Sequence, residues 1–185
     1  MAPTPAVIVV TGASGAGKST LVRGLAALGL PDVGCYELDS IGVPSSAEIV
    51  ARFGSGEAFQ AWALDEWIAR LARNADRVRV AVLDASVRPR AALDTLARHG
   101  VVSGAVVLVD CAYGERNARL RGPRGQPELA TPLMDTWAAY LRGQADALDV
   151  PVLDTTGATP HAGVAALNEY VAALLNGETG LDRRP

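Results

Sequence analysis

Residues 6–19 read Ala-Val-Ile-Val-Val-Thr-Gly-Ala-Ser-Gly-Ala-Gly-Lys-Ser, and they carry the strongest structural signal of the chain. Its first part, residues 6–11, is a short continuous apolar run, which is typical of a strand buried on both faces of a parallel sheet. Its second part holds three glycines, which let the backbone turn tightly, and it opens a helical pattern over 17–28. The stretch therefore predicts a strand, a glycine-rich turn and a helix in direct succession.

The glycine-rich turn matches the pattern G-x-x-x-x-G-K-[ST] at every fixed position. In this pattern, backbone N–H groups and the positive end of the following helix converge on phosphate oxygens. Lys18, the only lysine of the chain, is expected to reach the β- and γ-phosphates, and the Ser19 hydroxyl is expected to bind Mg²⁺. The residues predicted to bind the nucleotide in this turn are Gly12, Ala13, Ser14, Gly15, Ala16, Gly17, Lys18, Ser19 and Thr20.

The nucleotide is predicted to be ATP. GTPases usually read guanine with an Asn-Lys-x-Asp element, and a chain with no lysine besides Lys18 cannot contain one. Residues 39–42 do spell the GTPase switch pattern D-x-x-G, but they come too early in the chain, before the strand that ends in Asp84. ATP is therefore favoured over GTP.

Outside the first stretch, apolar runs alternate with helical patterns. Runs at 78–83, 105–109 and 150–153 resemble residues 6–11, and a weaker candidate strand lies near 34–38. Helical patterns occupy 17–28, 59–71, 91–99, 131–148 and 159–174, and the last two begin with Thr-Pro. This alternation predicts an α/β fold with a mainly parallel sheet. We expect one domain over 1–177, followed by a flexible polar tail over 178–185.

Two aspartates follow predicted strands. Asp84 ends the apolar run that begins at Val80, a Walker B pattern that can hold Mg²⁺ directly or through water. Asp39 follows the weaker strand and, if that strand is parallel to the first, can accept a proton from an acceptor hydroxyl. The alternatives are a helix cap for Asp84 and an Asx turn before Gly42 for Asp39. We predict that both carboxylates bind substrate and that Asp84 and Ser19 hold the metal.

Arginines cluster in residues 115–124, directly after the fourth predicted strand. Arg116 and Arg119 are three residues apart and share a helix face, and a Gly-Pro pair at 122–123 indicates a hinged loop. Arginines on such a flap can close over phosphates and stabilise transferring charge, whereas the alternative is a solvated basic helix end. We predict a catalytic role for Arg119 and nucleotide binding by Arg116, ahead of Arg121 and Arg124.

The acceptor side of the site is less clearly marked. Arg88 follows Asp84 at the same rim of the predicted sheet, where it either binds an acceptor or pairs with a neighbouring carboxylate. Trp62 and Trp67 are expected to be core or helix-packing residues, and one of them is a candidate for lining the acceptor pocket.

Composition bounds the classes of partner. The formal charge of −3 argues weakly against a nucleic-acid partner. The first residues lack the features of a signal peptide, and no apolar run approaches the length of a membrane span. Cys35 and Cys111 are not spaced like zinc ligands, so buried reduced thiols and a cytoplasmic location are expected. The protein is expected to be a monomer or a homodimer without a membrane or nucleic-acid partner.

The phosphate loop, the helical segment 45–74 and the sequence Glu115-Arg-x-x-Arg119 resemble those of the small P-loop kinases. This superfamily includes nucleoside monophosphate, shikimate and gluconate kinases and chloramphenicol phosphotransferase. The resemblance implies a three-layer P-loop NTPase fold with a five-stranded parallel sheet in the order 2-3-1-4-5, ATP, Mg²⁺, and a lid over 113–131. Segment 45–74 would bind the acceptor, residues 154–157 would lie close to adenine, and Arg119 would be a lid arginine.

These observations predict an ATP-dependent phosphotransferase that moves the γ-phosphoryl group to a hydroxyl of a small-molecule acceptor. Lys18, Asp39 and Arg119 would be catalytic, and Asp39, Asp84 and Arg88 would bind the substrates. Two alternatives stay open: a nucleoside monophosphate kinase, and a regulatory P-loop ATPase without a small-molecule acceptor. A polynucleotide end kinase is disfavoured by the acidic charge balance.

Overall fold

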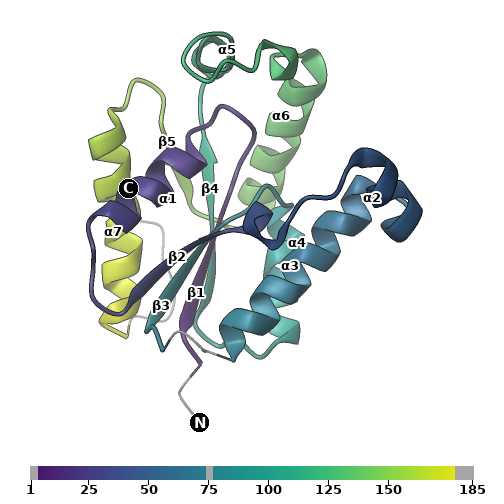
Figure 1. The fold of residues 1–185 in the computed structure, drawn as a ribbon. Helices are drawn as coiled ribbons and strands as arrows, with labels where there is room; N and C mark the ends of the chain where they lie inside the picture. Colours follow the sequence, from purple (N-terminus) through teal and green to yellow (C-terminus); the bar gives the residue numbers. More distant parts are fainter. Residues whose placement is uncertain (1–3, 74–76, 178–185) are drawn as a thin grey trace.

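The computed structural model describes residues 4–73 and 77–177 of the chain. Its strands form a parallel sheet in the order β2-β3-β1-β4-β5, which confirms the predicted order (Figure 1). The strands are β1 (Ala6–Thr11), β2 (Val33–Glu37), β3 (Val80–Asp84), β4 (Gly104–Asp110) and β5 (Val152–Asp154). The strands therefore follow the predicted apolar runs, with shifts at their ends of one or two residues.

Helices connect the strands and cover both faces of the sheet. They are α1 (Lys18–Ala27), α2 (Ser46–Phe53), α3 (Gly56–Ala72), α4 (Pro89–Arg98), α5 (Tyr113–Arg121), α6 (Pro132–Ala147) and α7 (Pro160–Leu175), with short 3-10 turns η1 (Leu38–Ile41) and η2 (Pro127–Leu129). Helices α1 and α7 cover one face, and α3, α4 and α6 cover the other (Figure 1). The result is a three-layer α/β fold.

The central strand β1 explains why residues 6–11 form an unbroken apolar run. Val7 and Val9 belong to the core beneath α3, α4 and α6, whereas Ile8 and Val10 belong to the core beneath α1 and α7. All four side chains are fully buried, because neighbouring side chains of a strand point to opposite faces and both faces are covered. The strand ends at Thr11, at the carboxyl ends of the parallel strands, and the glycine-rich loop begins there.

Helix starts follow local capping rules. Thr131 and Thr159 are the N-caps of α6 and α7, and their hydroxyls accept hydrogen bonds from the backbone N–H groups of Met134 and Ala162, at 3.3 and 3.2 Å. Each is followed by a proline in the first turn, as the two Thr-Pro pairs predict. The predicted helical segment 45–74 contains two helices, α2 and α3, which Gly54 separates with a φ of 81°.

The predicted tail, residues 178–185, lies outside the described residues. Of the helices described, none is both long enough and apolar enough to cross a membrane.

Candidate active site

The loop between β1 and α1 lies at the carboxyl edge of the sheet, and its path requires glycine. Gly12, Gly15 and Gly17 have φ angles of 149°, 84° and 108°, which disfavour residues with a Cβ atom. A Cβ at Gly12 would lie 2.2 Å from the Val109 carbonyl oxygen, and one at Gly15 would lie 2.9 Å from Leu120 Cγ on α5. The glycines therefore allow both the turn and the close approach of α5 to the loop.

Lys18 is the first residue of α1, and its side chain is folded back into the loop. The Nζ atom donates a hydrogen bond to the Ala13 carbonyl at 3.4 Å, and the residue is only 7% exposed. Burial lowers the pKa of Lys18, and the nearby carboxylate of Asp84 acts in the opposite direction. An anion bound at the loop would supply the negative charge that this buried ammonium group requires.

A polar cavity of about 220 Å³, which we call the phosphate cavity, opens beside the loop. The side chains around it come from the loop, α1, the ends of β2 and β3, η1 and the segment that follows α5. They are Ser14, Lys18, Ser19, Arg23, Glu37, Leu38, Asp39, Asp84, Ala85, Ser86 and Arg124. The fold thus brings Lys18, Ser19 and the two predicted carboxylates, Asp39 and Asp84, to one cavity.

Asp84 lies at the end of β3, directly beside Val10 of β1 and Glu37 of β2. Its side chain is largely buried, and burial raises its pKa, while a hydrogen bond from Ser19 and the charge of Lys18 act to lower it. Carboxylate and hydroxyl oxygens are ligands that Mg²⁺ accepts, usually together with waters and phosphate oxygens. The contact between Asp84 and Ser19 therefore fits a magnesium site next to the phosphate loop.

Asp39 is exposed, and it lies on the short turn η1. The turn is anchored at Leu38, whose side chain is buried and whose carbonyl accepts a hydrogen bond from Trp67 Nε1 at 3.0 Å. Trp67 is buried on α3, as a core tryptophan was predicted to be. Helix α3 thus holds the turn that presents Asp39 to the phosphate cavity. Glu37, the last residue of β2, is instead paired with Arg23, and the distance between Glu37 Oε1 and Arg23 Nε is 2.7 Å.

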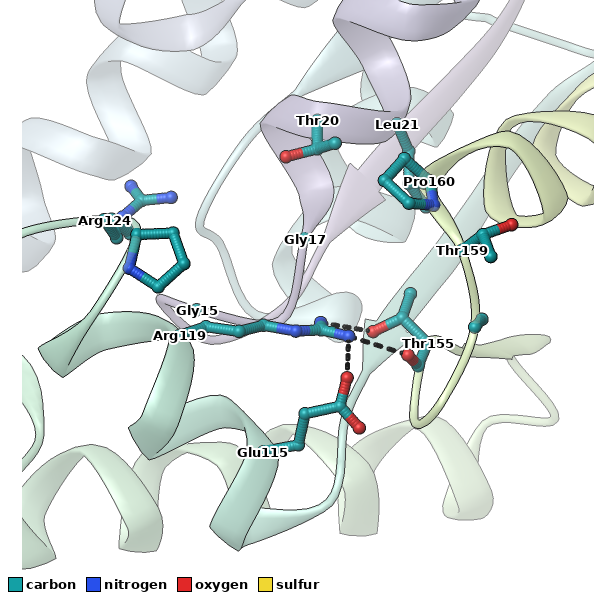
Figure 2. A pocket seen from close by; sticks show the side chains of 12 residues that line it. Gly15, Gly17, Thr20, Leu21, Glu115, Arg119, Arg124, Thr155, Thr159 and Pro160 are labelled. Atoms are coloured by element: carbon teal, nitrogen blue, oxygen red, sulfur yellow. Dashed lines mark hydrogen bonds and ion pairs between the residues drawn. The ribbon is translucent and has the colours of Figure 1, made fainter.

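A second cavity of about 530 Å³, which we call the base cavity, lies between the phosphate loop, α5 and the start of α7 (Figure 2). The residues around it are Gly15, Gly17, Thr20, Leu21, Glu115, Arg119, Pro123, Arg124, Thr155, Ala158, Thr159 and Pro160. The loop that follows β5 contributes to it, which is where residues 154–157 were expected to approach adenine. Arg124 lines both this cavity and the phosphate cavity.

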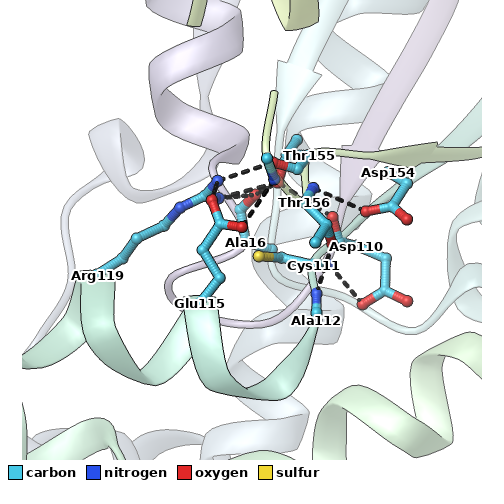
Figure 3. Close-up of polar contacts among 10 residues, drawn as sticks. Ala16, Asp110, Cys111, Ala112, Glu115, Arg119, Asp154, Thr155 and Thr156 are labelled. Carbon is cyan, nitrogen blue, oxygen red and sulfur yellow. Dashed lines mark hydrogen bonds and ion pairs between the residues drawn. The ribbon is translucent and has the colours of Figure 1, made fainter. Parts of the chain in front are cut away.

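Arg119 lies beside the base cavity and is the centre of a polar network that connects α5, the loop after β5 and the phosphate loop (Figures 2 and 3). Its guanidinium donates to the Thr155 hydroxyl at 2.9 Å and to the Thr155 carbonyl at 2.8 Å, and it forms an ion pair with Glu115. The Thr155 hydroxyl in turn donates to the Ala16 carbonyl at 2.7 Å, and Glu115 accepts from the Gly157 N–H at 2.7 Å. The network joins α5 and the loop after β5 to the phosphate loop.

Thr155 is a residue that sequence reasoning missed. The segment 154–157 was expected to lie near the nucleotide, but no role was predicted for this side chain. The available signal was its position, since a hydroxyl residue directly after a strand end faces the ligand edge of a parallel sheet.

Nucleotide binding was predicted for Arg116, and the structure pairs its guanidinium with a carboxylate of the protein. Its side chain is 4% exposed, and its guanidinium forms an ion pair with Asp135 on α6 and donates to the Cys111 carbonyl at 3.4 Å. The stem of Arg116 lies beside Gly15 of the loop, and its guanidinium extends past the loop to Asp135 on α6. Arg124, which the sequence ranked behind Arg116, instead reaches the two cavities.

A third cavity of about 440 Å³, which we call the acceptor cavity, lies among the first turns of α3, α4 and α6. The residues around it are Ser14, Gly56, Glu57, Gln60, Ala61, Leu64, Ser86, Val87, Arg88, Ala91, Met134 and Trp137. Two of them, Ser14 and Ser86, also line the phosphate cavity, so the two spaces adjoin. The tryptophan among the residues around this cavity is Trp137, and not Trp62 or Trp67. Trp62 instead packs on Phe53, with a distance of 5.1 Å between the ring centroids.

Arg88 adopts the second of its two predicted roles, because it is paired with a carboxylate. Both of its terminal nitrogens donate to Glu57 at the start of α3, one of them at 3.1 Å. Its guanidinium carbon also lies 5.9 Å from the ring centroid of Trp137. Arg88 therefore joins α3, α4 and α6 at the wall of the acceptor cavity.

No protein-family model matches the sequence, and no curated protein matches it either. Solved structures do resemble the fold over nearly the whole chain. A shikimate kinase from Acinetobacter baumannii in complex with shikimate has a TM-score of 0.58 at 16% identity, covering 96% of this chain and 97% of that chain. A gluconokinase from Sinorhizobium meliloti has a TM-score of 0.57 at 21% identity, covering 95% of each chain.

A thymidylate kinase from Candida albicans has a TM-score of 0.62 at 12% identity, covering 96% of this chain and 94% of that chain. At such low identities the likeness shows the fold alone, which this chain shares with these solved kinase structures.

Proposed function

We propose that this chain is an ATP-dependent phosphotransferase that moves the γ-phosphoryl group to a hydroxyl of a small-molecule acceptor. The observation that carries the proposal is the order of the three cavities. The base cavity shares Arg124 with the phosphate cavity, and the phosphate cavity shares Ser14 and Ser86 with the acceptor cavity. A donor and an acceptor bound on either side of the loop would therefore meet at the carboxylates. The kinase names of the similar structures agree with this activity.

In the proposed reaction, the acceptor hydroxyl oxygen forms a bond to the γ-phosphorus, and the bond between that phosphorus and the ADP oxygen breaks. The hydroxyl proton passes to Asp39, which is the exposed carboxylate of the phosphate cavity. Lys18 and the loop N–H groups bind the phosphates, and Arg119 and Arg124 stabilise charge from the lid side. Ser19 and Asp84 would hold Mg²⁺, which supplies further positive charge beside the β- and γ-phosphates.

Two variants test the proposal in an ATP-consumption screen over alcohols, sugars, nucleosides and nucleotides. Lys18→Ala should abolish turnover with every acceptor, because it removes the cation of the phosphate loop. Asp39→Asn should lower kcat by about a hundredfold or more and leave the KM for ATP unchanged, since it removes the proton acceptor but keeps the nucleotide contacts. Asp94→Asn, an exposed aspartate on α4, is the matched control and should behave like the wild type.

Wild-type turnover by Asp39→Asn would contradict the assigned role. ATP hydrolysis at the same rate with and without every acceptor would instead favour a regulatory ATPase.

A further inference from the structure

The charges of the acceptor cavity cancel one another. Among the described residues that line it, the ionisable side chains are Glu57 and Arg88, and they form a two-point ion pair. Two-point pairing between guanidinium and carboxylate is directional, and here it uses both terminal nitrogens, which arginine also uses to bind carboxylates and phosphates. Arg88 is thus already engaged with an anion of the protein itself.

Each partner of the Glu57–Arg88 ion pair is also stabilised by its own surroundings. Glu57 lies in the first turn of α3, where the helix dipole favours a negative charge, and the hydrogen bonds from Arg88 lower the pKa of this carboxyl. Arg88 is the N-cap residue of α4, and its guanidinium carbon lies 5.9 and 5.8 Å from the ring centroids of Trp137 and Tyr140. The pair therefore joins the starts of two helices to the aromatic side chains of a third.

The rest of the cavity wall divides into neutral polar and apolar parts. Ser14, Ser86 and Gln60 supply hydroxyl and amide groups, and the two serines lie on the side that adjoins the phosphate cavity. Leu64, Met134 and Trp137 supply apolar surface. A volume of about 440 Å³ is within the range of small-molecule sites.

We infer that the acceptor is an uncharged, hydroxyl-bearing ring compound with an apolar face, and that Glu57 excludes anionic acceptors by occupying Arg88. A carboxylate or phosphate on the acceptor would have to displace Glu57 or lie beside a like charge. A neutral acceptor leaves the ion pair intact, places hydroxyls near Ser14 and Ser86, and packs its apolar face on the side of Trp137 and Met134. This inference rests on the proposed function, because it concerns the acceptor of the proposed transfer.

Matched pairs of compounds test the inference. We would compare glucose with glucuronate, phenyl glucoside with phenyl glucuronide, and thymidine with thymidylate, since each pair differs mainly in one anionic group. Phosphoryl transfer from ATP gives kcat/KM, and calorimetric titration in the presence of magnesium and ADP gives binding. The wild type should favour the neutral member of a pair about tenfold or more in both measurements.

Glu57→Gln keeps the size of the side chain but removes the charge that neutralises Arg88. The preference should therefore shift about tenfold toward the anionic member, and adding Arg88→Met to Glu57→Gln should cancel that shift. Glu66→Gln removes the same charge from an exposed position elsewhere on α3 and should leave the preference unchanged. Because Glu57 is itself exposed, Glu57→Gln should keep the melting temperature of the wild type.

Preference of the wild type for the anionic members would overturn the inference, and so would an equal preference in the wild type and Glu57→Gln. Failure of all six compounds to bind would also overturn it. Selective binding of neutral members without any phosphoryl transfer would support this inference while contradicting the proposed phosphotransferase, so the two failures are distinguishable.

Discussion

Asp84 and Lys18 lie in one buried site, and burial shifts their pKa values in opposite directions. The pKa of Asp84 is raised and that of Lys18 is lowered, because desolvation disfavours the charged form of each group. A magnesium–nucleotide complex would supply both missing partners, a cation for the carboxylate and phosphates for the ammonium group. The site is therefore built to gain most when the metal and the phosphates bind together.

This arrangement predicts a pH dependence of nucleotide binding. A raised pKa means that Asp84 becomes protonated at a higher pH than an exposed aspartate does, and a protonated carboxyl group no longer binds Mg²⁺ as a carboxylate. The affinity for magnesium–ADP should thus fall on acidification, and the fall should begin at a higher pH than it would for an exposed aspartate. Calorimetric titration from neutral to acidic pH measures this fall.

Asp84→Asn should bind magnesium–ADP more weakly at neutral pH and lose the part of the pH dependence that belongs to the carboxyl group. The phosphate groups of the nucleotide titrate identically with both proteins, so the difference between the two profiles isolates Asp84. Parallel profiles for the wild type and the variant would show that this carboxyl group does not contact the metal.

Between elements, the ion pair of Arg116 and Asp135 joins α5 to α6, and neither residue lines any of the three cavities. Asp135→Ala would leave the buried guanidinium without its partner and should destabilise the protein by about 3 kcal/mol in urea unfolding. The double variant Arg116→Met/Asp135→Leu replaces the pair by apolar side chains and should recover most of that loss. It should also bind magnesium–ADP as the wild type does, whereas a clear loss of affinity would restore the nucleotide role first predicted for Arg116.

The turn η1 depends on α3 in a similar way, through the hydrogen bond from Trp67 to the Leu38 carbonyl. Trp67→Phe keeps an aromatic ring in the core but removes the donor, so it should cost about 1 kcal/mol of stability. It should also lower kcat several-fold at an unchanged KM for ATP, because Asp39 follows Leu38 on that turn. Trp62→Phe, on the same helix but partly exposed, is the control. An unaltered kcat in Trp67→Phe would mean that Asp39 is positioned without this bond.

At the scale of the whole molecule, the local sequence predicts those strands and helix starts whose pattern lies within a single segment of the chain. The apolar runs predict the strands themselves, whereas the order 2-3-1-4-5 was implied by the resemblance to the small P-loop kinases, and the sheet has that order. Thr131 and Thr159 begin helices because capping is decided within one turn.

Contacts between distant segments are not predictable in this way. The prediction for Arg116 did not include its ion pair with Asp135 of α6, because that pair joins segments that lie apart in the sequence. Trp137 stands in an apolar stripe that is typical of core packing, yet it lines the acceptor cavity. Thr155 is one threonine among several, and only the tertiary fold brings it to Ala16 and Arg119.

The central place of β1 has a consequence for synthesis of the chain. Val9 pairs with Leu83 of β3 on one side and with Val106 of β4 on the other. The strand that precedes the phosphate loop therefore pairs only with strands that lie far later in the sequence. Such non-local pairing slows folding and leaves an apolar strand with open edges while the ribosome is still adding β4. The glycine-rich loop at the end of β1 is therefore flanked by strands on both sides only after β4, which ends at Asp110, has been added.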